Sequence, residues 1–186
     1  MEKRMGFNKS EFRAEERDGK KYIEGEFIVF NQRTQLWGNV YEEIAPESIS
    51  DLTDIRALYN HNQDIVLGTT GNKTVSLEKR ETGLWGSIEV NEEDQDALNA
   101  HSRIKRGDVP GCSFGFIPTK EEHKTEGENE IFRVTEMQLF EVSPCVFPAY
   151  PQTSISARRK DFEEIKSREL TVRKKKLIER TKRRTT

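Results

Sequence analysis

Short apolar segments, separated by breaks that contain glycine, constrain the fold of this chain more than any other feature. Each is rich in β-branched and aromatic residues and is four to nine residues long, which is typical of β-strands. The segments are YIEGEFIVF at 22–30, LWGNVYEEI at 36–44, IRALYN at 55–60, IVLG at 65–68, TVSLEKR at 74–80 and LWGSIEV at 84–90. The pattern predicts a sheet-rich domain.

One helix is predicted, over NEEDQDALNAHSRIKRG at 91–107. Asn91 is the expected N-cap, acidic residues follow it, and basic residues precede Gly107, which can end the helix in a left-handed conformation. His101 lies in this charged helix and is expected to face solvent. With the strands, this predicts an α+β fold that is mainly β.

Charge divides the chain into an acidic body and a basic tail. The segment 158–186 contains 13 basic and 5 acidic residues, which leaves 18 basic and 28 acidic residues in the rest. We expect an N-terminal extension at 1–20, one folded domain at 21–155, and a basic tail at 156–186 that is helical or disordered.

Several classes of function are disfavoured by composition. No apolar run reaches the roughly 20 residues of a membrane span, and the charged N-terminus lacks a signal-peptide pattern, so we expect a cytoplasmic protein with reduced cysteines. No zinc-type or nucleotide-binding motif occurs, so no metal or cofactor is expected. Nucleic-acid binding is not expected, because the body is acidic and Phe162 is the tail's single aromatic residue.

The stretch PGCSFGFIP at 110–118 predicts a strand with two unlike faces. Alternation places Cys112, Phe114 and Phe116 on a packing face and Ser113 and Gly115 on a small, polar one. The following segment, IFRVTEMQLFEVSPCVFPAY, predicts a hairpin partner with its loop near Gly127. A loop centred there would place Ser113 opposite Glu141 on one sheet face.

A nucleophile, a base and an orienting acid can be chosen from these residues: Ser113, His61 and Glu141. Ser113 and His61 could equally be an ordinary strand serine and a surface-loop histidine. Glu141 lies among apolar residues, where a carboxylate needs a partner such as His61. His123 is the alternative third member, and Cys112 ranks below Ser113 as nucleophile because it points to the packing face.

In order and spacing, ALYNHNQDIVLG, GLWGSIEV, IKRGDVPG, CSFGFIP and FEVSPCVFPAY resemble the prohead maturation serine proteases of tailed bacteriophages. These enzymes are similar in fold to the herpesvirus assemblin protease. The resemblance covers residues 22–150. It implies a compact, closed or partly closed β-barrel flanked by a few helices, with His61 as general base, Ser113 as nucleophile and Glu141 orienting the histidine, where herpesvirus proteases have a second histidine.

The resemblance also implies partners and a location. Such proteases act inside the assembling prohead in the host cytoplasm, and they cut the scaffold or the scaffold-like segment of the major capsid protein precursor, and themselves. The analogy with assemblin implies a homodimer. Two other hypotheses about function stay open. The chain could be a non-catalytic capsid-assembly module that binds scaffold through a sheet edge, or a nucleic-acid-binding barrel, which the acidic body disfavours.

Overall fold

The computed structural model describes residues 3–8, 12–147 and, with gaps, 159–175. Contacts divide the chain into two units, Met1–Tyr150 and Pro151–Thr186. In the second unit the described residues are helical. The predicted domain boundary at 155–156 lies outside the described residues.

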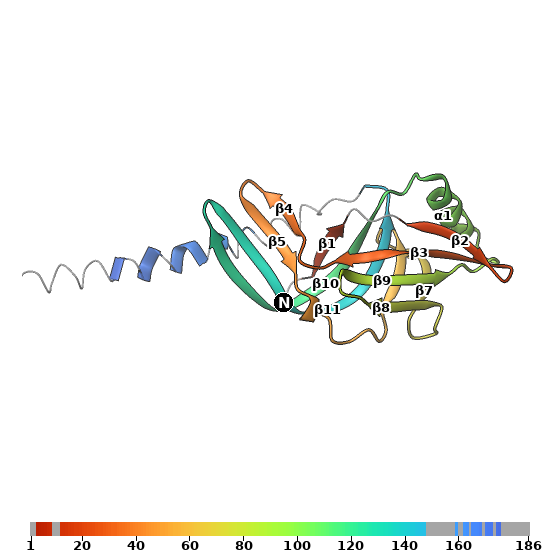
Figure 1. Cartoon of the computed structure of the whole chain (residues 1–186), viewed down its shortest axis with the longest axis horizontal. Helices are drawn as coiled ribbons and strands as arrows, with labels where there is room; N and C mark the ends of the chain where they lie inside the picture. Colours follow the sequence, from red (N-terminus) through yellow and green to blue (C-terminus); the bar gives the residue numbers. More distant parts are fainter. Residues whose placement is uncertain are drawn as a thin grey trace, which may run out of the picture. The chain divides into compact units, whose positions relative to one another are not determined.

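The first unit is built mainly of strands, as predicted (Figure 1). In chain order its elements are β1 (Arg4–Asn8), β2 (Arg13–Arg17), β3 (Lys20–Val29), β4 (Arg33–Trp37), β5 (Val40–Ile44), the 3-10 helix η1 (Pro46–Ser48), β6 (Arg56–Tyr59), β7 (Asn62–Thr69), β8 (Val75–Lys79), β9 (Gly83–Glu89), α1 (Gln95–Arg106), β10 (Gly111–Glu126) and β11 (Asn129–Cys145). The segment 36–44, predicted as one strand, is instead divided between β4 and β5 by a turn at Gly38, whose φ is +47°.

The described strands form two sheets. One has seven strands, with β1, β10, β11, β5 and β4 in order and with β6 and β7 attached through β11; the other has the order β2, β3, β9, β8. Neither sheet closes on itself over the described strands, so the predicted barrel is not confirmed. The N-terminal residues, predicted to be an extension, supply one edge strand of each sheet: β1 pairs with β10, and β2 pairs with β3.

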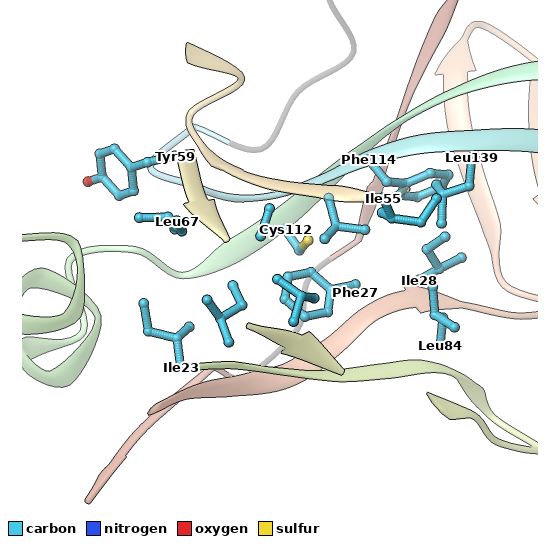
Figure 2. Close-up of a cluster of buried hydrophobic side chains, with 14 of the residues drawn as sticks. Ile23, Phe27, Ile28, Ile55, Tyr59, Leu67, Leu84, Cys112, Phe114 and Leu139 are labelled. Atoms are coloured by element: carbon cyan, nitrogen blue, oxygen red, sulfur yellow. The ribbon is translucent and has the colours of Figure 1, made fainter. Parts of the chain in front are cut away.

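The hydrophobic core lies between β10 of the first sheet and β3 of the second (Figure 2). Phe114 and Cys112 of β10 face Phe27 and Ile28 of β3, and all four are at most 1% exposed. Full burial of a large apolar side chain contributes roughly 1.5–3 kcal/mol. The packing face predicted for the PGCSFGFIP strand is therefore confirmed.

The predicted helix is present, but it begins later than expected. Asp94 is its N-cap, and the Asp94 side chain accepts a hydrogen bond from the backbone N–H of Asp96. Asn91, the predicted cap, instead accepts from the N–H of Glu93 in the preceding turn. Gly107 ends the helix with φ +88°, as predicted.

His101 is buried, which makes the prediction of a solvent-facing histidine wrong. It is 7% exposed and shares the buried helix face with Ala97, Ala100 and Ile104. Helical spacing of three and four residues places His101 on that face despite the charged neighbours. Burial lowers the pKa of its imidazole.

The hairpin of β10 and β11 turns at Gly127, as predicted, but its register differs by two residues from the estimate. Ser113 lies opposite Ser143, and Glu141 lies opposite Gly115. One residue of the shift arises because the turn is centred between Gly127 and Glu128, and the other arises from the irregularity in the ladder between Gly115 and Phe116. Because the offset is an even number of residues, Ser113 and Glu141 still share one face.

Candidate active site

Three polar side chains follow one another along the same face of β11. Glu141, Ser143 and Cys145 alternate with core residues such as Val142, and each of the three is at most 3% exposed. The Ser143 hydroxyl donates to Oε2 of Glu141 over 2.5 Å. Sequence reasoning missed Ser143 and Cys145, although the alternation that selected Glu141 places them on the same face.

His61 lies in a tight turn between β6 and β7, and this turn packs against the end of β11. Asn60 and His61 have φ values of +53° and +59°, and the pairing of Tyr59 with Asn62 closes the turn. The N–H of Asn60 donates to the Pro144 carbonyl over 3.0 Å. The Asn60 side-chain oxygen accepts from the N–H of Val146 over 2.9 Å. These bonds fix the turn against the end of β11.

His61 is paired with Glu141, the first residue of this row. Its Nδ1 lies 2.6 Å from Oε1 of Glu141. The side chains of His61 and Glu141 are 23% and 4% exposed. The pairing of Glu141 with His61 expected from the sequence is thus present.

Ser113 lies beside this pair on the neighbouring strand. It is the cross-strand partner of Ser143 and is 1% exposed. Its hydroxyl donates over 2.7 Å to the backbone carbonyl of Gly6 in β1. The structure therefore places the serine opposite Ser143, on the strand beside Glu141, with its proton directed at a carbonyl of its own chain.

The strand has no room for a side chain at Gly115. A Cβ atom there would lie 2.6 Å from the Phe140 ring and 2.8 Å from Oε1 of Glu141. Both distances are too short for real contacts, so a larger residue would displace the carboxylate that holds His61. A cavity of about 520 Å³ opens beside this point, and its walls include His61, Glu141 and Phe140.

A buried acid, a histidine bonded to it and an adjacent serine are the groups used in acyl transfer by serine proteases. A sequence model of the caudovirus prohead serine proteases matches residues 8–168. The chain belongs to this family. No curated protein matches the chain at a significant level of sequence similarity. A solved structure, the capsid assembly protease gp21 of bacteriophage T4, matches with a TM-score of 0.42 and 14% identity over 80% of this chain and 100% of that one.

Membership in the caudovirus prohead serine protease family makes the chain a serine protease, as the resemblance implied. Among the described residues, no group of three or more His, Cys, Asp or Glu side chains could hold a metal ion. In the same part of the chain, no helix is long and apolar enough to cross a bilayer.

The other candidates from the sequence lie apart from the pair of His61 and Glu141. His123, the alternative third member, lies 2.9 Å from Glu130 and stacks against Phe132 in the outer part of the hairpin. Cys112 is completely buried on the core face, and burial raises the pKa of its thiol well above the usual value. Neither arrangement suits a nucleophile or an orienting group in this family.

The electrostatics of His61 favour its charged form. Burial by itself lowers the pKa of the imidazole, but the interaction with Cys145 and the hydrogen bond with the charged Glu141 outweigh burial and raise it to about 10. A histidine acts as a general base only when it is neutral. Peptide cleavage is therefore expected to increase as pH rises above neutrality.

Replacing Cys145 by alanine is expected to lower the pKa of His61, because the interaction with this thiol is among those that raise it. The measurement is an NMR titration of the histidine rings, together with the pH dependence of kcat/KM, whose rising limb should move to lower pH. Cys112→Ala is the matched control, since that thiol lies on the opposite, core face and should leave His61 unchanged. An unshifted His61 in Cys145→Ala would show that the thiol does not control this titration.

Proposed function

We propose that Ser113, His61 and Glu141 form the catalytic triad of this prohead protease, with Ser113 as nucleophile, His61 as general base and Glu141 orienting the histidine. The observation that carries the proposal is the 2.6 Å pairing of His61 with Glu141, on the sheet face that also holds Ser113. The family assignment supports serine-based peptide cleavage independently.

The proposed mechanism uses the same three groups in both half-reactions. Neutral His61 accepts the Ser113 proton as the hydroxyl oxygen bonds to a peptide carbonyl carbon, and the imidazolium then protonates the leaving amine. A water molecule repeats the sequence on the acyl-enzyme. Glu141 accepts from Nδ1 of His61 throughout, and the Ser143 hydroxyl holds the second oxygen of Glu141 in place.

The proposed substrates are the scaffold, or the scaffold-like segment of the major capsid protein precursor, and the protease itself, inside the assembling prohead in the host cytoplasm. Membership in a prohead protease family supports this assignment. A homodimer is proposed on the analogy with assemblin alone.

The test is intact-mass analysis over time of the wild type beside Ser113→Ala, each alone and mixed with the cognate capsid precursor. Fragments of the precursor and of the protease that form only with the wild type are the expected result, and their ends give the cleavage sites. Equal fragmentation by both proteins would exclude Ser113 as the nucleophile.

The basic tail is proposed to dock the protease to scaffold or capsid precursor. The described residues of the tail are helical, and those from 165 to 175 include Lys166, Arg168, Lys174 and Lys175. Deleting residues 158–186 is expected to reduce incorporation into proheads severalfold while leaving peptide cleavage by the isolated protein unchanged. Quantitative immunoblotting of purified proheads measures this, and unchanged incorporation would contradict the docking role.

A further inference from the structure

The strand that carries Ser113 has its open edge covered by the N-terminus of the same chain. β1 is the last strand of the seven-stranded sheet and pairs antiparallel with β10 over Cys112–Phe116. Gly6 lies opposite Phe114, and Phe7 lies opposite Ser113. Without β1, this edge would present unpaired backbone groups, which is the arrangement that binds extended peptides by strand addition.

The contact at Ser113 engages the atom that the proposed mechanism needs. The Ser113 hydroxyl donates over 2.7 Å to the Gly6 carbonyl, and the side chain is 1% exposed. A hydroxyl that donates there is not donating to His61, and it is covered from solvent. The arrangement resembles a bound peptide whose backbone carbonyl accepts a hydrogen bond from the nucleophile and is not attacked by it.

The fit of β1 depends on the absence of a side chain at Gly6. A Cβ atom at this position would lie 2.1 Å from Cζ of the Phe114 ring and 2.4 Å from Cε2. Phe114 is 1% exposed in the core and cannot move aside freely. Glycine is therefore the residue that lets a strand approach this edge closely.

Residues in β1 and just before it line the cavity beside His61 and Glu141. Lys3 and Met5 line the same 520 Å³ cavity as His61 and Glu141, and the Lys3 ammonium lies 4.9 Å from the centre of the Phe140 ring. The Arg4 side chain pairs with Glu121 over 2.7 Å and fixes the strand from its other face. β1 thus covers the edge, and Met5 of β1 and Lys3 before it form part of the cavity wall.

We propose that the edge of β10 at Cys112–Phe116 is the peptide-binding site of the protease, that it takes an extended segment with glycine opposite Phe114, and that β1 occupies it in cis and inhibits the resting enzyme. The proposal rests on the proposed function, because it takes Ser113 as the nucleophile. Release of β1 uncovers Ser113 and frees the edge for substrate.

The test compares the rate at which a fluorophosphonate probe labels Ser113 in full-length proteins, measured by intact mass and peptide mapping. In Gly6→Val the added side chain should expel β1 and increase the labelling rate at least tenfold over the wild type. The control Gly71→Val changes an exposed glycine whose backbone conformation accepts side chains and which lies far along the chain from this edge, and it should label like the wild type.

A peptide competition tests the glycine requirement directly. The synthetic peptide KRMGFN, the sequence of residues 3–8, should slow labelling of Gly6→Val, whereas KRMVFN should have no effect at the same concentration. If Gly6→Val does not fold, as judged by circular dichroism, Arg4→Ala loosens β1 by removing the ion pair with Glu121. Its control is Lys20→Ala, which removes an exposed pair with Glu89 in the other sheet.

The outcomes separate the two proposals. Equal labelling of Ser113 in the wild type, in the β1 variant and in its control, or slower labelling in a folded β1 variant, overturns inhibition by β1 and leaves the assignment of Ser113 intact. Equal inhibition by KRMGFN and KRMVFN overturns the glycine requirement. Failure of Ser113 to label in any of these folded proteins overturns the nucleophile assignment and the inhibition together.

Discussion

A Ser113→Ala protein is expected to fold normally and to cut peptides on the order of 10⁵ to 10⁶ times more slowly than the wild type. The loss is this large because no other group on the strand can form the acyl-enzyme at the same position. The folding cost is small, about 1 kcal/mol, since one hydrogen bond to the Gly6 carbonyl is removed and alanine fills nearly the same volume. Turnover of a peptide that spans a mapped cleavage site, with thermal unfolding alongside, measures both effects.

Ser143→Ala is the matched control, because Ser143 is a buried serine directly opposite Ser113. Its hydroxyl bonds to the Glu141 carboxylate, an interaction of roughly 1.5–3 kcal/mol for a charged partner. We expect a loss of about tenfold to 100-fold in kcat. The reverse ranking, with Ser143→Ala inactive and Ser113→Ala active, would transfer the nucleophile to Ser143.

A Glu141→Gln protein is expected to lose about 10⁴ in kcat. Both carboxylate oxygens of Glu141 accept hydrogen bonds, one from His61 and one from Ser143. A glutamine offers one acceptor and one donor, so it either leaves Ser143 without an acceptor or turns an N–H toward Nδ1 of His61 and stabilises the wrong tautomer. Steady-state kinetics above neutral pH measure the loss.

Glu130→Gln is the control for this substitution, because Glu130 belongs to the other histidine–glutamate pair, 2.9 Å from His123. That pair lies in the outer part of the hairpin, so cleavage should be unchanged. Similar losses in both variants would mean that kcat reports damage to the hairpin and not the orientation of His61.

The Glu141→Gln substitution is also expected to change how stability depends on pH. The pKa of His61 in the folded protein, about 10, is above the unfolded value of 6.5. Protonated His61 therefore stabilises the folded protein fully below pH 6.5, and this contribution is lost as pH rises toward 10. The free energy of unfolding of the wild type should fall over this range, by an amount on the order of a few kcal/mol. Removing the Glu141 charge should flatten that slope.

Local patterns in the sequence were sufficient to predict much of the structure. Alternation in PGCSFGFIP identifies the core face with Phe114 and the polar face with Ser113, because strand periodicity is a local property. Turn and capping chemistry identifies the hairpin at Gly127 and the helix end at Gly107. The resemblance in motif order identified the family, which the match over residues 8–168 confirms.

The remaining features depend on contacts between distant segments. The register of β10 against β11 at Ser113 depends on the ladder irregularity between Gly115 and Phe116, which counting from the turn cannot reveal. The position of His61 depends on Asn60 bonding to Pro144 and Val146, more than 80 residues away. β1 was missed because a five-residue strand within a charged terminus is stabilised by its partner β10 and carries little pattern of its own.

The two-residue turn at Asn60 and His61 and the long hairpin tolerate changes in length very differently. An insertion in the turn would rotate the histidine away from Glu141, since both residues are already in the left-handed conformation that closes the shortest connection. The hairpin beyond Pro118 can gain or lose residues in pairs, because Ser113 and Glu141 are neighbours through the ladder beside them. We therefore expect relatives to differ in the chain length between the serine and glutamate motifs and to keep the histidine motif at a fixed distance from its strand.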